Sequence, residues 1–101
     1  LKKYNIFSYE GLLSSIYVNY TDYLEFILDN KNKINFSFTD NNNKLLKRAM
    51  QVDNLNFTKI LLNEKEVLNS KTIIKDIKRI SGIKNNESIE LAHKIICLNK
   101  F

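Results

Sequence analysis

The chain has 101 residues, 44% of them hydrophobic, which is enough for one domain with a small core. No apolar run approaches the roughly 18 residues of a membrane span, and no signal-peptide pattern opens the sequence. From this length the sequence predicts a single domain, residues 1–101. The lone cysteine, Cys97, excludes an internal disulfide, which predicts a reducing intracellular and cytoplasmic setting.

The net charge of +5 is unevenly distributed along the chain. Asn, Lys, Ile, Phe and Tyr, which are encoded by A/T-rich codons, make up more than half of the residues. An AT-rich genome therefore accounts for much of the basic character. Residues 1–69 carry nine basic and eight acidic side chains, whereas residues 70–101 carry seven and three. The excess positive charge lies in the last third.

The first predicted helix pair spans about residues 9–35. Ser8 is a residue type that caps helix N-termini, and it precedes an apolar pattern that predicts a helix over residues 9–18. Thr21 is expected to cap a second helix, over residues 22–30, after a polar turn. The residues expected to face the core are Leu12, Leu13, Ile16, Tyr23, Leu24, Phe26, Ile27 and Leu28.

Residues 31–43 connect this pair to the next. They combine an alternating segment at 35–39, typical of extended chain, with Asp-Asn-Asn-Asn at 40–43, a strong turn signal. The second pair, about residues 43–69, has two short helices joined by a turn at residues 52–54. Helices this short are marginal alone in water, so we expect them to pack against neighbours through Leu45, Leu46, Ala49, Met50, Leu55, Phe57, Ile60, Leu61 and Leu62.

The third unit, residues 70–101, is the least regular. A helix is expected over residues 71–81, and Gly82 follows it where a left-handed C-terminal residue is favoured. Asn86 is expected to cap a final helix over residues 87–98, whose inward residues are Ile89, Leu91, Ala92, Ile95 and Ile96.

A shift of 34 residues places the three units in register. The positions that it aligns are Leu12, Leu46 and Ile80; Tyr23, Phe57 and Leu91; Ile27, Leu61 and Ile95; Leu28, Leu62 and Ile96; and, in the turns, Asn19, Asp53 and Glu87. We therefore predict an all-α fold, an α-solenoid of about three stacked helix-pair repeats with an irregular C-terminal unit.

Residues 9–69 resemble the ankyrin repeat. The consensus of that family is TPLHxAAxxGHxEIVKLLLxxGAxVN, with a period of about 33 residues. In residues 44–69, Leu46 falls on the Leu of TPLH, Asp53 on the glycine between the helices, and residues 59–62 on KLLL. Residues 10–35 match in the same way. The resemblance implies an ankyrin-like stack.

The departures from the family pattern leave alternatives open. The Thr-Pro pair and the histidine are missing from every unit, and Asn42 stands where the glycine of the β-turn belongs. The 34-residue period also fits tetratricopeptide repeats, although their helices are longer. Another helical solenoid and an unrelated helical bundle are therefore the other two interpretations.

The resemblance also implies a function, binding a partner protein along a groove without catalysis. Tyr17, Tyr20 and Tyr23 recur at helical spacing, and Tyr17 falls on a groove-facing position. Rigid aromatic rings dominate contact energies, which makes Tyr17 a candidate anchor. The groove-facing residues expected from the matching positions are Tyr9, Tyr17, Asn43, Lys47, Gln51 and Asn85.

A basic stripe in the last third suggests an alternative function. Lys71, Lys75, Lys78 and Arg79 lie opposite the isoleucines of their predicted helix. Such a stripe is usually a solvated face, but it is also the pattern of a nucleic-acid-contacting or ribosome-type assembly component. Aromatic residues do not interleave with these cations, so protein binding is the first hypothesis.

Catalytic and metal chemistry find little support in the sequence. His93 and Cys97 are four residues apart and could supply two zinc ligands, but the chain has no further His or Cys to complete a site. The serines lack a histidine placed to activate them, and there is no glycine-rich phosphate loop. We therefore expect no enzyme activity, no cofactor, no metal and no small-molecule substrate.

Overall fold

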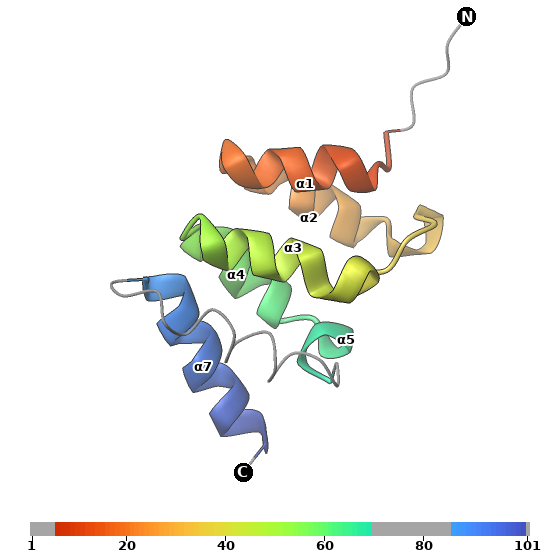
Figure 1. The fold of residues 1–101 in the computed structure, drawn as a ribbon. Helices are drawn as coiled ribbons and strands as arrows, with labels where there is room; N and C mark the ends of the chain where they lie inside the picture. The colour runs from red at the N-terminus through yellow and green to blue at the C-terminus, as the bar shows by residue number, and fades with distance from the viewer. Residues whose placement is uncertain (1–5, 70–85, 101) are drawn as a thin grey trace, which may run out of the picture.

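The computed structural model describes residues 6–69 and 86–100, with the side chains of residues 97, 99 and 100 left out. These parts of the chain are all-helical, as predicted, and contain no strand (Figure 1). The helices are α1 (Tyr9–Tyr17), α2 (Thr21–Asp29), the 3-10 helix η1 (Lys31–Lys33), α3 (Asp40–Gln51), α4 (Leu55–Leu62), α5 (Lys65–Leu68) and α7 (Glu87–Lys100). The expected helix over residues 71–81 and its Gly82 lie outside the described residues.

The start of α1 is fixed by Ser8, as the sequence predicts. Its hydroxyl oxygen accepts a hydrogen bond from the Gly11 amide at 3.0 Å, which satisfies one of the free N–H groups at the helix end. The predicted cap of α2 was wrong. Thr21 is the first residue of that helix, and the capping position belongs to Tyr20, whose side chain makes no capping bond.

The turns that close the two helix pairs share a backbone conformation. Asn19 in the α1–α2 turn and Asp53 in the α3–α4 turn both have left-handed φ values, 54° and 53°. Asn and Asp tolerate this conformation better than most residues other than glycine. Both turns therefore use a residue type that suits the left-handed conformation they adopt.

The Asp-Asn-Asn-Asn segment forms a left-handed turn that leads into α3. Asn41, Asn42 and Asn43 have φ values of 56°, 59° and 61°, so the right-handed part of the helix begins after them. A run of three asparagines is suited to this turn, because asparagine is enriched in the left-handed region. The sequence predicted the turn but not its continuity with α3.

Because Asn42 is held at φ 59°, we expect Asn42→Gly to leave stability unchanged or raise it by up to about 1 kcal/mol, since glycine has no Cβ to strain there. Asn42→Ala is the matched control and should cost about 1 kcal/mol, because alanine pays the full left-handed penalty. Urea melts of the two variants measure this. A glycine variant that unfolds earlier than the wild type would place Asn42 outside the left-handed region.

The helices lie in successive layers around one core. In Figure 1, α1 and α2 are uppermost, α3 and α4 lie beneath them, and α7 lies below α4. Contacts join α3 to α1, α4 and α7, and join α4 to α2, α5 and α7. The most buried side chains include the predicted Leu12, Ile16, Leu24, Ile27, Leu45, Leu46, Met50, Phe57, Leu61 and Leu62, together with Phe38 and Val67, which were not predicted.

Two buried asparagines link these layers close to the turns that close the helix pairs. Asn54 donates from Nδ2 to the Ile16 carbonyl at 2.7 Å, and its Oδ1 accepts from the Phe57 amide at 3.1 Å. Asn86 repeats both bonds, to the Met50 carbonyl at 2.6 Å and from the Ile89 amide at 2.9 Å. Each amide therefore caps its own helix and ties that helix to the last turn of the preceding layer.

These bonds correct the predicted register of the last helix. Asn86 follows Asn54 by 32 residues, not 34, so Ile89 rather than Leu91 is the counterpart of Phe57. Ile89 is 5% exposed, whereas Leu91 is only half-buried. Glu87, which the 34-residue alignment placed with the turn residues, is the exposed first residue of α7, where the helix predicted over residues 87–98 begins. The capping requirement of the helix, which an apolar alignment ignores, sets the register.

Candidate functional site

Exposed apolar side chains gather where the helix pairs turn. Tyr17, Val18, Tyr20 and Val52 are 58%, 74%, 56% and 42% exposed. Together with the exposed Gln51 they form what we call the turn-end surface. Single exposed apolar residues are ordinary, but a cluster of them marks an interaction site more often than chance placement does.

The helix geometry explains why these residues meet. Tyr17 and Gln51 end α1 and α3, and Val18 and Val52 are the next residues of their turns. The two turns lie side by side, since the Asn56 side-chain amide donates to Asn19 Oδ1 at 3.5 Å and Asn54 reaches the Ile16 carbonyl. In Figure 1 both turns lie at the left-hand ends of their helix pairs, with the start of α7 below them.

A shallow hollow of about 400 Å³ opens between the two turns. The buried side chains of Ile16 and Asn54 belong to its lining, whereas those of Tyr17, Val52 and Asp53 are exposed to solvent. Asp53 is held by the Ser88 amide, which donates to its Oδ1 at 2.9 Å. The full lining is Ile16, Tyr17, Asn19, Val52, Asp53, Asn54, Leu55 and Asn56.

The structure brings only some of the predicted groove residues together. Tyr17 and Gln51 share the turn-end surface, whereas Lys47 is half-buried in the middle of α3. Tyr9 lies at the other end of α1, half-buried, with its ring edge-on to Phe36 at a centroid distance of 5.5 Å. The predicted set therefore does not form one contiguous patch.

Asn43 requires a correction. Its side chain is 0% exposed, because the left-handed turn at residues 41–43 places it inside the fold rather than on a groove. A buried amide cannot contact a partner. Asn85 and the basic stripe of Lys71, Lys75, Lys78 and Arg79 lie outside the described residues.

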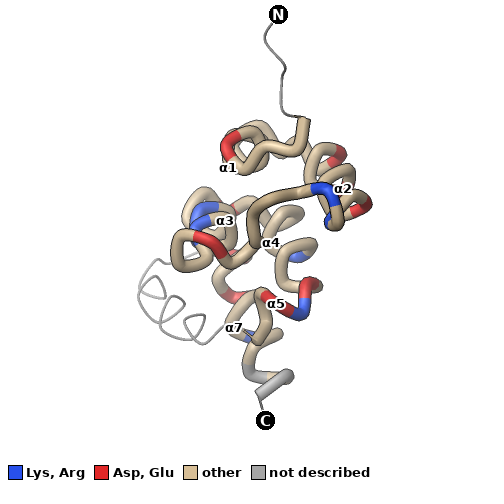
Figure 2. The backbone as a smooth tube through the Cα atoms, turned by 90° about the vertical axis from the view of Figure 1, so that its right-hand side faces the viewer, with Lys and Arg blue, Asp and Glu red and all other residues tan. Residues whose placement is uncertain are grey.

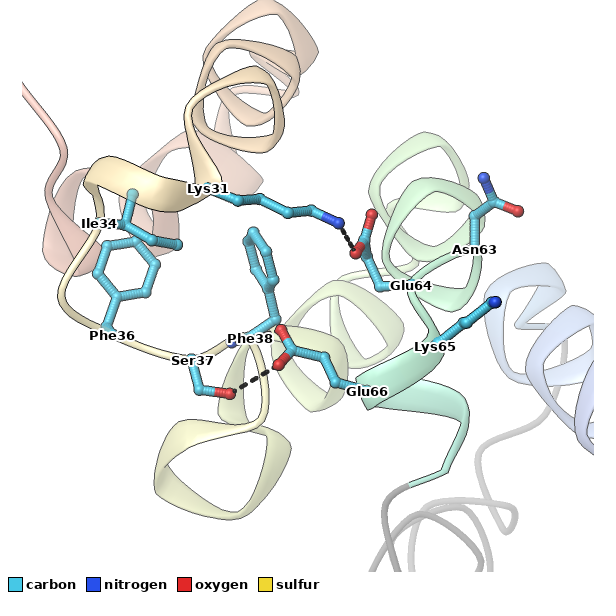
Figure 3. A pocket seen from close by; sticks show the side chains of 9 residues that line it. All are labelled: Lys31, Ile34, Phe36, Ser37, Phe38, Asn63, Glu64, Lys65 and Glu66. Atoms are coloured by element: carbon cyan, nitrogen blue, oxygen red, sulfur yellow. Dashed lines mark hydrogen bonds and ion pairs between the residues drawn. The ribbon is translucent and has the colours of Figure 1, made fainter.

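A second hollow, of about 540 Å³, lies at the opposite end, beneath the connection between the helix pairs (Figure 3). Lys31 forms an ion pair with Glu64 across it. Glu66 accepts from the Ser37 hydroxyl and from the Phe38 amide, both at 3.2 Å. These charged groups pair with each other or accept hydrogen bonds from the connection, so they hold the connection in place. We therefore assign no ligand to the hollow.

Among the described residues, both acidic and basic side chains occur at this end of the fold. Figure 2, which faces the connection, shows acidic and basic positions interspersed on the described helices. The described residues contain no group of three or more His, Cys, Asp and Glu side chains arranged to hold a metal ion. None of the helices within these ranges combines the length and apolarity that crossing a bilayer requires.

Comparison with known proteins gave no match. No protein-family model, no curated protein and no solved structure is significantly similar to this chain. The ankyrin resemblance therefore stays a prediction from residues 9–69.

Proposed function

We propose that this chain is a non-catalytic protein-binding module that holds a partner protein at its turn-end surface. The observation that carries the proposal is the clustering of Tyr17, Val18, Tyr20 and Val52, all substantially exposed, on two adjacent turns. Burying aromatic and branched side chains of this size supplies the main favourable term in protein association.

The proposed architecture is an ankyrin-like stack, and two features support it. The α1–α2 and α3–α4 pairs close through turns with the same left-handed residue, Asn19 or Asp53. The paired bonds of Asn54 and Asn86 attach each later layer to the one before it in the same way. A structural element reused at successive layers is what a repeat protein requires, because each unit contacts mainly its neighbours.

The mechanism that we propose is rigid display. Hydrogen bonds from Asn54 and Asn56 fix the two turns relative to each other, so little chain entropy is lost when a partner binds. In this arrangement Tyr17 is the central anchor and Gln51 supplies a polar group at the rim. Lys47 and Tyr9 would contact only a partner that extends along α3 and α1.

Removing the anchor is expected to weaken binding. We predict that Tyr17→Ala combined with Gln51→Ala lowers affinity for a bound peptide by roughly 1–3 kcal/mol, the usual range for an interface anchor. The peptide would be selected from a library of short random sequences against the wild-type chain. Its affinity for each variant would then be measured by fluorescence anisotropy.

Glu10→Gln is a suitable control, since Glu10 is exposed in the first turn of the same helix, away from the turn. It should bind as the wild type does. Because Tyr17 is 58% exposed, its loss should leave the fold intact, which circular dichroism can verify. Equal affinity of the double variant and the control would remove the turn-end surface from consideration.

The charge asymmetry supports a second candidate function. Residues 70–101 hold most of the net positive charge, and a cationic segment can bind nucleic acid through phosphates. On this alternative, Lys71, Lys75, Lys78 and Arg79 would carry the contact and the turn-end surface would not.

A further inference from the structure

We propose that the partner presents a basic residue, Lys or Arg, flanked by apolar side chains. This cation is bound between the tyrosines of the turn-end surface and the acidic side chains beside that surface. The inference rests on the proposed function and adds the chemistry of the partner segment to it. Three acidic side chains beside the exposed apolar cluster carry the argument: Asp22, Asp53 and Glu87.

Each of the three acids lies at the turn end. Asp22 is in the first turn of α2, two residues after Tyr20. Asp53 is exposed and lines the same hollow as Tyr17. Glu87 is exposed at the start of α7, next to the Ser88 amide that binds Asp53. Asp22 and Glu87 gain stability from the dipoles of their own helices, but their carboxylates remain exposed to a partner.

Basic residues of the described chain are largely confined to other places. Arg48, partly exposed, is one helical turn before Val52 and is the basic residue nearest to this surface along α3. The others lie on η1 and α5, in the earlier turns of α3, in the last turn of α4, and in the middle and at the C-terminal end of α7. Among the described residues, the turn-end surface is therefore apolar, and the charged side chains beside it are mainly acidic.

This combination selects for a particular partner chemistry. Tyrosine rings attract cations at their faces, Arg more often than Lys, and acids at the rim of an interface speed the approach of a positively charged segment. Val18 and Val52 offer apolar contact to the flanking residues. Phosphates would instead meet repulsion here, so nucleic acid is disfavoured as the occupant of this surface.

Peptide selection tests the inference. Peptides recovered from a random display library on the wild-type chain should be enriched in Lys or Arg next to leucine or aromatic residues. Their affinity should fall about two- to tenfold when Asp22→Asn and Asp53→Asn are combined, the scale expected for exposed charge pairs. Asparagine at position 53 keeps an Oδ1 that can accept from the Ser88 amide, so the turn geometry is retained.

Glu10→Gln combined with Glu25→Gln is the charge control, because both residues are exposed away from the turns and the pair changes net charge by two, as the aspartate pair does. Peptides without basic enrichment, or affinities unchanged by the aspartate substitutions, would overturn this inference. The proposed function would stay intact if Tyr17→Ala/Gln51→Ala still weakens binding. Failure to recover any peptide that depends on Tyr17 and Gln51 would overturn both.

Discussion

Replacing Leu61 with alanine is expected to lower the free energy of unfolding by about 2–5 kcal/mol, the cost of truncating a buried leucine. Leu61 is 1% exposed and lies on α4, the helix that contacts α2, α3, α5 and α7. A domain of this size is commonly stable by only about 5–15 kcal/mol, so the substitution would remove a large share of the total.

Denaturant melts measure the loss, and Leu98→Ala provides the control. Leu98 is also on a helix but is 70% exposed, so its truncation should change stability by less than about 0.5 kcal/mol. A loss below about 1 kcal/mol for Leu61→Ala would contradict the burial of α4 at the centre of the fold.

Asn54→Ala is expected to cost about 1.5–2.5 kcal/mol. The substitution removes a helix cap, worth about 1 kcal/mol. It also removes the 2.7 Å bond to the Ile16 carbonyl, which still accepts from the Asn19 amide at 3.4 Å, and the loss of one such hydrogen bond adds about 0.5–1.5 kcal/mol. Urea denaturation followed by circular dichroism would quantify the change.

Two variants separate the cap from the link between layers. Asn54→Ser can still cap α4, but serine is too short to span to Ile16, so it should recover only about 1 kcal/mol of the loss. Asn56→Ala, on the same helix but exposed and bonded at 3.5 Å, should be nearly neutral. An alanine variant at position 54 within about 0.5 kcal/mol of the wild type would show that the linking bond is not made.

Periodic apolar residues were the most informative signal for the fold. The spacing of Leu45, Leu46, Ala49 and Met50 predicted the buried face of α3, because an amphipathic helix must place such residues inside. Phe38 and Val67 were not predicted, since they lie in or beside short irregular segments where no period can be read.

The role of the buried asparagines could not be read from the sequence. Asn86 was predicted as a cap, but neither Asn86 nor Asn54 could be assigned a bond to the preceding layer, because that bond depends on how the layers pack. The register of α7 was wrong for the same reason. Asn43 was placed on a groove because its position matched one in the family pattern, whereas the left-handed turn buries it.

For the candidate site, the alignment identified Tyr17 and Gln51 but not Val18 and Val52. Tyr20 was noted only through its helical spacing from Tyr17. A valine in a turn carries no sequence signal of exposure, because the same residue is usually buried. Its significance appears only when two turns lie beside each other, which is a property of the packed structure.

Salt dependence of binding is the most direct test of where the partner binds. Affinity would be measured by fluorescence anisotropy from low to physiological ionic strength, with the selected peptide and with a single-stranded oligonucleotide as probes. The proteins would be the wild type, the Tyr17→Ala/Gln51→Ala variant and a Lys75→Glu/Lys78→Glu variant. The account predicts that peptide affinity falls with salt only as far as one or two exposed charge pairs allow, and that only the Tyr17→Ala/Gln51→Ala variant loses most of the affinity. Tight oligonucleotide binding that is abolished by charge reversal, with log affinity falling by about 0.7 per phosphate for each log unit of salt, as for single strands, would contradict it.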